Sequence, residues 1–302
     1  MIDIVKNKHL IVISGATAIG KTALSIKLAQ HFNTEIVSAD SRQFYRELKI
    51  GVAQPSEQEL ATIKHHFIGN LSVTEDYNVG LYEKDSLALL HKLFRTNNTL
   101  IMVGGSGLYI DAICLGLDSF PEVDEKIKKE YIAGYNNKGI AFLQKELKKK
   151  DPDYFEMVDI NNHQRLIRAL SVIRKSGKTF SSFRNKKSIK RNFKISHFSL
   201  EMERNKLYKK INKRVDIMRQ EGLIKEVEGL IPYRKKNALQ TVGYKELFSF
   251  FDGDINLKEA IQKIKQNTRR FAKRQISWFK RNENIQHLKI ENAFQEIIRN
   301  LT

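Results

Sequence analysis

A glycine-rich segment near the N-terminus carries residue types that bind phosphate. Residues 15–22 read Gly-Ala-Thr-Ala-Ile-Gly-Lys-Thr and match the P-loop pattern G-x-x-x-x-G-K-T. Gly15 and Gly20 let the backbone bend so that successive N–H groups point at one anion, and Lys21 adds a positive charge. The Thr22 hydroxyl is a candidate ligand for Mg²⁺. We expect a diphosphate or triphosphate to bind the whole loop, which consists of Gly15, Ala16, Thr17, Ala18, Ile19, Gly20, Lys21 and Thr22.

Asp40 stands just past a second short apolar segment, residues 35–39. In an open α/β sheet the carboxyl ends of the strands line the ligand crevice, so we expect Asp40 and the P-loop to face the same space. This position favours a catalytic carboxylate, and a cap of the following short helix is the structural alternative.

The elements that must position these residues alternate between strands and helices, which indicates the α/β fold class. Short apolar runs predict strands at 10–13, 35–39, 100–103 and 196–200. Helical apolar spacing predicts helices at 23–32, 79–94, 203–221 and 256–281.

Residues 118–195 lose the strand pattern and predict helices at 122–135, 139–150 and 162–175. We therefore expect a core domain made of residues 1–117 and 196–302, interrupted by a helical insertion domain of residues 118–195. The end of this insertion, residues 184–194, carries six basic residues and no acid. Such a run fits either a solvated face or an RNA contact.

The charge balance favours a polyanionic partner. The chain has 53 Lys and Arg residues against 34 Asp and Glu residues, a formal net charge of +19. Basic side chains that neutralise phosphates release condensed counterions when they bind, so this surplus fits a nucleic acid. Residues 258–281 alone hold nine basic residues and one acid, which makes the predicted helix at 256–281 a candidate phosphate-binding surface.

Other features of the sequence exclude some classes of site and protein. No apolar run approaches the ~20 residues of a membrane helix, and the first residues lead directly into the first strand without room for a signal peptide, so we expect a cytoplasmic protein with no membrane partner. The single Cys114 excludes an internal disulfide and offers no zinc pattern. His65 and His66 point in opposite directions on a strand and cannot jointly chelate a metal; we expect one at the rim of the site and one in solvent.

Seven motifs, in the same order over about residues 9–285, resemble those of the tRNA dimethylallyltransferases. They are the P-loop at 15–22, Ser38-Ala39-Asp40-Ser41-Arg42-Gln43, Ile50-Gly51-Val52-Ala53, Gly104-Gly105-Ser106-Gly107-Leu108-Tyr109, Gln164-Arg165-Leu166-Ile167-Arg168, Thr241-Val242-Gly243-Tyr244-Lys245 and Lys273-Arg274-Gln275-Ile276-Ser277-Trp278-Phe279. The chain departs from many relatives at Ala16, where they have proline, and at Ser106, where they have threonine.

The resemblance implies a P-loop NTPase-like parallel sheet core with an inserted all-helical domain that approaches the tRNA anticodon stem-loop. It implies transfer of a dimethylallyl group from dimethylallyl diphosphate to N6 of adenosine 37, in tRNAs that read codons beginning with U. Arg214 stands where the family has a diphosphate-binding arginine, and Thr17 where it has a donor contact. We further expect Mg²⁺ as cofactor and a monomeric protein.

For this reaction we assign roles to the candidate residues. Asp40 is the candidate general base, while Lys21 and Arg214 are the candidates to stabilise the departing diphosphate. The expected contacts to tRNA are Asp40, Ser41, Arg42, Gln43, Ser106, Gln164, Arg165, Leu166, Ile167, Arg168, Thr241, Val242, Gly243, Tyr244, Lys245, Lys273, Arg274, Gln275, Trp278 and Lys280.

Three alternatives keep the P-loop but change the function. A nucleotide or small-metabolite kinase also places an acid after the second strand, but it does not need the basic helix. An RNA-binding nucleotide switch predicts nucleotide-dependent affinity without a covalent product. An enzyme that prenylates free adenine nucleotides is the nearest alternative, and the basic insertion and basic helix argue against it.

Overall fold

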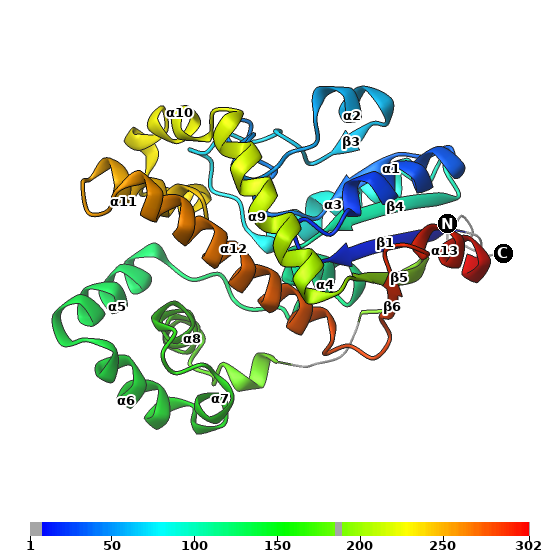
Figure 1. Cartoon of the computed structure of the whole chain (residues 1–302). Coiled ribbons are helices and arrows are strands. Elements are labelled where there is room, and N and C mark those ends of the chain that lie inside the picture. Colours follow the sequence, from blue (N-terminus) through cyan, green and yellow to red (C-terminus); the bar gives the residue numbers. More distant parts are fainter. Residues whose placement is uncertain (1–7, 185–188, 302) are drawn as a thin grey trace. The chain divides into compact units, whose positions relative to one another are not determined.

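The computed structural model describes residues 8–184 and 189–301, so residues 185–188 of the basic run at 184–194 lie outside the described part (Figure 1). The chain forms two compact units, a first unit of residues 8–114 and 190–301 and a helical unit of residues 115–189. The expected insertion boundary at residue 195 is too late, because Lys194 and Ile195 already pair with the first strand of the core.

The first unit is built on a six-stranded parallel sheet, and this confirms the α/β fold class. The strand order is β3-β2-β4-β1-β5-β6. In chain order the strands are β1 (His9–Gly15), β2 (Ile36–Ser38), β3 (His65–His66), β4 (Thr99–Gly104), β5 (Lys194–Glu201) and β6 (Gln286–Lys289). Because every pair is parallel, all carboxyl ends lie at one edge, where ligands bind in such sheets.

Helices cover both faces of this sheet. Along β1, Leu10 and Val12 belong to one hydrophobic cluster and Ile11 and Ile13 to another, as expected from the alternation of side chains on a strand that is buried on both faces. The helices of the first unit are α1 (Lys21–His31), α2 (Glu57–Thr62), α3 (Val79–Leu93), α4 (Gly107–Cys114), α9 (Arg204–Gln220), α10 (Leu223–Glu228), α11 (Tyr244–Phe251), α12 (Leu257–Phe279) and α13 (Ala293–Leu301). Within the described residues, no helix is both long and apolar enough to cross a membrane.

The helical unit has a hydrophobic core of its own. Its helices are α5 (Glu125–Lys138), α6 (Ile140–Lys150), α7 (Pro152–Met157) and α8 (His163–Ser176). Leu143 and Leu147 of α6 and Leu166 and Leu170 of α8 are fully buried in that core. The buried Asp151 carboxylate accepts the N–H of Tyr154 in the first turn of α7, which stabilises the start of this short helix.

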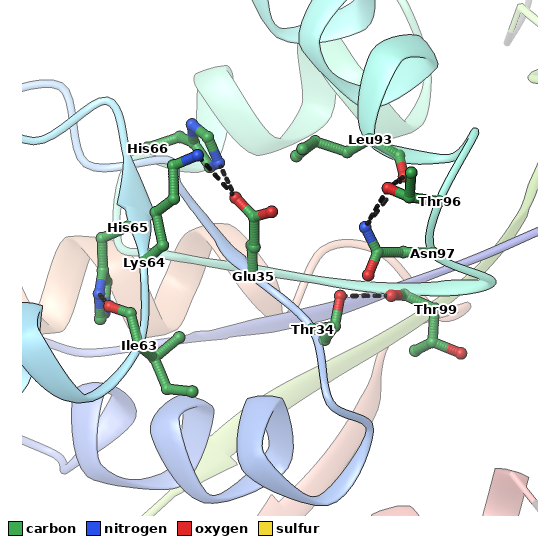
Figure 2. Close-up of polar contacts among 10 residues, drawn as sticks. All are labelled: Thr34, Glu35, Ile63, Lys64, His65, His66, Leu93, Thr96, Asn97 and Thr99. Carbon is green, nitrogen blue, oxygen red and sulfur yellow. Dashed lines mark hydrogen bonds and ion pairs between the residues drawn. The ribbon is translucent and has the colours of Figure 1, made fainter.

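The two adjacent histidines fix the β3 edge of the sheet and are not at the site rim. His66 Nε2 lies 2.6 Å from a carboxylate oxygen of Glu35, and Lys64 Nζ lies 3.4 Å from the same oxygen; Figure 2 shows both side chains pointing at Glu35. His65 Nδ1 lies 2.7 Å from the Ile63 carbonyl oxygen. Both histidines are half-buried and neither lines the cavity described below, so the expected split between a rim residue and a solvent-facing residue is wrong.

Candidate active site

The P-loop connects β1 to α1, and its lysine is folded back onto the loop. Lys21 Nζ donates hydrogen bonds to the carbonyl oxygens of Gly15 at 3.0 Å and of Ala16 at 2.9 Å. Burial lowers the pKa of Lys21 to about 8, an effect that Asp40 opposes and Arg214 strengthens. The loop therefore holds a cation close to its own backbone, and burial makes this cation easier to deprotonate than an exposed lysine.

Asp40 lies two residues beyond the end of β2. Its Oδ1 accepts the N–H of Arg42 at 3.1 Å, so the carboxylate stabilises the turn that follows, as the structural alternative expects. The same side chain lines a cavity that Thr17 and Arg214 also line. Asp40 therefore both stabilises the turn and lines the cavity.

Arg214 reaches the P-loop from α9. Its Nη1 lies 3.4 Å from Thr17 Oγ1, to which it donates. Burial lowers the pKa of Arg214, and the carboxylates of Asp40 and Glu59 oppose this shift. Two cations, one carboxylate and the Thr17 hydroxyl thus meet beside the P-loop, although Lys21 and Arg214 are 193 residues apart in the sequence.

The glycine turn after β4 lies against the Asp40 segment. The Ser41 N–H donates to Ser106 Oγ at 3.0 Å, and Ser106 Oγ donates to Ser41 Oγ at 3.1 Å. Gly104 is needed for this approach, because a Cβ atom there would lie 2.2 Å from the Ala39 carbonyl oxygen. The turn therefore aligns two strand ends at the edge where the site forms.

Gln275 of α12 connects the P-loop to the glycine turn. Its Oε1 accepts the Thr17 N–H at 2.8 Å, and its Nε2 donates to the Gly105 carbonyl oxygen at 2.9 Å. The side chain is 5% exposed. Both ends of the amide are therefore engaged inside the first unit, and the expected contact of Gln275 with tRNA stays a prediction.

A cavity of about 820 Å³ collects most of the candidate residues of the first unit. Those that line it are Thr17, Asp40, Ser41, Arg42, Ser106, Arg214, Thr241, Val242, Gly243, Lys245, Arg274, Gln275 and Trp278. Those that do not line it are Gly15, Ala16, Ala18, Ile19, Gly20, Lys21, Thr22, Gln43, Tyr244, Lys273 and Lys280, so Thr17 is the P-loop residue in the lining. Phe271, which is not among the predicted site residues, also lines the cavity and is 38% exposed.

Several candidate tRNA contacts have their polar groups occupied or their side chains buried. Tyr244 is fully buried in the first unit, and Leu166 and Ile167 are buried in the helical unit, so these side chains pack in the hydrophobic cores. Arg42 Nη1 donates to the carbonyl oxygens of Asn237 at 2.6 Å and Ala238 at 3.2 Å, so it stabilises that segment. Trp278 Nε1 donates to Asp111 Oδ2 at 2.9 Å, which fixes the orientation of the indole ring in the cavity wall.

The exposed candidates fall into two groups that belong to different units. In the helical unit, Gln164, Arg165 and Arg168 are exposed on α8. In the first unit, Lys273 and Arg274 are exposed on α12. Each group offers donors suited to phosphate.

Comparison with known proteins identifies the family. The model of the IPP transferase family matches residues 43–282. The chain is 52% identical over 297 residues to the tRNA dimethylallyltransferase of Flavobacterium johnsoniae, with 96% of each chain covered. It is 51% identical over 291 residues to the tRNA dimethylallyltransferase of Christiangramia forsetii, again with 96% of each chain covered.

Solved structures give the same result. The tRNA isopentenylpyrophosphate transferase of Bacillus halodurans matches with a TM-score of 0.71 and 33% identity, over 98% of this chain and 96% of that one. A eukaryotic dimethylallyltransferase acting on tRNA matches with a TM-score of 0.78 and 27% identity, over 93% of this chain and 74% of that one. The chain therefore belongs to the IPP transferase family, the tRNA dimethylallyltransferases, and is a prenyl-transferring enzyme.

Proposed function

We propose that this chain transfers a dimethylallyl group from dimethylallyl diphosphate to N6 of adenosine 37, in tRNAs that read codons beginning with U. The observation that carries the proposal is one cavity in which Thr17 of the P-loop, Asp40 and Arg214 face each other in a member of this family. A kinase needs the P-loop and an acid as well, but the relatives with which this chain shares half of its residues are prenyltransferases of tRNA.

The donor diphosphate is proposed to bind at the P-loop end of the cavity. Lys21 and Arg214 supply positive charge there, and the Thr17 hydroxyl already lies 3.4 Å from Arg214 Nη1. Lys21 must leave the carbonyl oxygens of Gly15 and Ala16 to reach the anion, so diphosphate and loop carbonyls compete for it. These cations stabilise the charge that develops on diphosphate as the C1–O bond breaks.

Asp40 is proposed to accept the proton from N6. The exocyclic amine of adenine is a weak nucleophile, because its lone pair is delocalised into the ring. As the N6–C1 bond forms and diphosphate leaves with the electron pair of the C1–O bond, one N6 proton passes to the Asp40 carboxylate. General-base assistance of this kind typically accounts for ~10²–10⁴-fold in rate.

The protein groups at the P-loop would supply only some of the ligands that Mg²⁺ needs. Within the described residues, no three His, Cys, Asp or Glu side chains are grouped to hold a metal. Mg²⁺ usually combines one or two protein ligands with phosphate oxygens and water, and the half-buried Thr22 hydroxyl at the start of α1 would be such a ligand. When bound, Mg²⁺ would neutralise charge on the diphosphate.

The acceptor is proposed to be the anticodon stem-loop, with adenosine 37 unstacked into the cavity. Single-stranded loops are where proteins read RNA bases, and extruding one base costs a few kcal/mol. The proposed phosphate contacts are Lys245, Lys273 and Arg274 of the first unit, together with Gln164, Arg165 and Arg168 of the helical unit, which we propose contacts the anticodon stem. We also propose that the enzyme is cytoplasmic and monomeric.

One labelling experiment tests the proposal. The protein is incubated with Mg²⁺, dimethylallyl diphosphate labelled in the allyl group, and either unmodified tRNA or AMP. We expect label on adenosine 37 of tRNA and none on AMP. Label on AMP alone would identify an adenine-nucleotide prenyltransferase, while absence of label on both would refute prenyl transfer.

A further inference from the structure

The carboxylate of Glu226 is held by four hydrogen-bond donors. Oε2 accepts the N–H groups of Lys49 at 2.9 Å and Ile50 at 2.7 Å. Oε1 accepts the N–H of Gly51 at 2.9 Å and the hydroxyl of Tyr244 at 2.7 Å. A carboxylate has about four acceptor positions, so this one is fully used, and hydrogen bonds to an ionised acceptor are stronger than neutral ones.

These four bonds join two segments that are far apart in the sequence. Tyr244 begins α11 and is fully buried, and its ring packs directly on the backbone at Gly51. A Cβ atom at Gly51 would lie 2.6 Å from Tyr244 Oη. Burial and the neighbouring Glu226 carboxylate raise the pKa of Tyr244, so its hydroxyl remains a donor.

The segments fixed in this way line the cavity, although Glu226 itself does not. Residues 51–53 and 241–243 all belong to the cavity lining, and we call them the two-segment wall. Other contacts hold the same backbone: Gln43 Nε2 donates to the Ala53 carbonyl oxygen at 2.8 Å, and the Gly243 N–H donates to Glu246 Oε2 at 2.8 Å. Glu226 thus shapes the cavity from behind its wall.

Residues 241–243 of the two-segment wall directly precede α11. In Figure 1, α10 and α11 lie at the end of the first unit opposite α1, which follows the P-loop. The exposed Lys245 stands beside the wall and adds a positive charge there. If the diphosphate occupies the P-loop end of the cavity, the part lined by the two-segment wall remains open for the acceptor.

We infer that Glu226 is a positioning residue for the acceptor: it fixes the two-segment wall against which the adenosine and its neighbouring nucleotides bind. This inference rests on the proposed function. It adds that donor and acceptor bind at different parts of the cavity. A carboxylate is required, because the nitrogen of a glutamine amide cannot accept the N–H or O–H groups that one carboxylate oxygen now accepts.

The test compares three variants in steady-state kinetics, with the anticodon stem-loop and dimethylallyl diphosphate varied in turn. Glu226→Gln leaves two donors facing an amide nitrogen, and we expect kcat/KM for the RNA to fall roughly tenfold while the donor KM stays within about twofold. Tyr244→Phe removes one bond of the four and is expected to cause a smaller fall. Glu228→Gln is the matched control, since Glu228 is exposed on the same helix, and it is expected to behave as wild type.

The outcomes separate this inference from the proposed function. A wild-type protein that does not label tRNA refutes the proposed function itself. An active wild type with Glu226→Gln indistinguishable from Glu228→Gln overturns the inference, as does an equal loss for donor and acceptor. If Glu226→Gln does not fold by circular dichroism, Tyr244→Phe decides, and an unchanged kcat/KM for the RNA overturns the inference.

Discussion

Asp40 provides a first prediction at the scale of single residues. Asp40→Asn keeps an oxygen for the Arg42 N–H, which now lies 3.1 Å from Oδ1, so the turn is expected to persist. The amide cannot take a proton from N6. We expect single-turnover prenylation of tRNA to slow by roughly 10²–10⁴-fold, with tRNA affinity unchanged within about threefold.

The matched control for Asp40→Asn is Asp76→Asn, an exposed carboxylate of the first unit that does not line the cavity. It is expected to keep wild-type turnover. Near-normal turnover of Asp40→Asn would exclude Asp40 as the base, and a parallel loss of tRNA affinity would assign it to RNA binding.

Lys21 gives a second prediction at this scale, through pH. Because burial lowers its pKa to about 8, the free enzyme carries this charge below pH 8 and loses it above. Diphosphate binding needs the charged form, so donor affinity is expected to be constant at lower pH and to weaken by up to about tenfold per pH unit above about pH 8. Equilibrium titration with dimethylallyl diphosphate between about pH 6.5 and 9.5 measures donor affinity as a function of pH. This range brackets the pKa of Lys21.

The Lys21→Arg variant is the comparison for this profile. Guanidinium stays protonated over the whole range, so its donor affinity is expected to be weaker but independent of pH. A wild-type profile that stays flat through pH 9 would show that the charge of Lys21 does not control donor binding.

At the scale of elements, Gly104 at the end of β4 lies against Ala39, the residue that follows β2. Gly104→Ala places a Cβ atom 2.2 Å from the Ala39 carbonyl oxygen, and neither backbone can move without disturbing the sheet. We expect the free energy of unfolding to fall by about 2 kcal/mol or more, measured by urea denaturation.

Gly229→Ala is the control at the same scale. Gly229 has φ −63°, and the nearest atoms to a new Cβ lie at 3.7 Å, so alanine fits. The stability is expected to stay the same or rise by up to about 1 kcal/mol. Equal stability of the two variants would show that the β2–β4 approach tolerates a methyl group.

For the whole molecule, the net charge of +19 predicts that tRNA binding depends on salt. The logarithm of the association constant is expected to fall linearly with the logarithm of salt concentration, with a slope of about −0.7 to −0.9 per neutralised phosphate. Lys273→Gln, on the exposed face of α12, is expected to reduce the magnitude of the slope by about one unit.

Lys27→Gln is the matched variant for this measurement, because it removes the same charge from the exposed face of α1. It is expected to leave the slope unchanged. If both variants change the slope equally, net charge alone determines binding and α12 is not a specific phosphate-binding surface.

Much of the fold followed from local patterns. The strands predicted at 10–13, 35–39, 100–103 and 196–200 correspond to β1, β2, β4 and β5, because continuous apolar runs are typical of strands buried on both faces. The strand β6 was not predicted, since Gln286, His287 and Lys289 are exposed and give no apolar pattern.

The sequence by itself determined the family motifs, the P-loop, the α/β class and the candidate roles of Asp40, Lys21 and Arg214. These depend on residue type and on spacing within a few positions. Only the tertiary structure decided what Gln275 and Glu226 do. Gln275 contacts Thr17 across 258 positions, and Glu226 contacts Gly51 across 175. Amphipathic spacing predicts which face of a helix is buried. Which residues that face contacts depends on the packing of the whole unit.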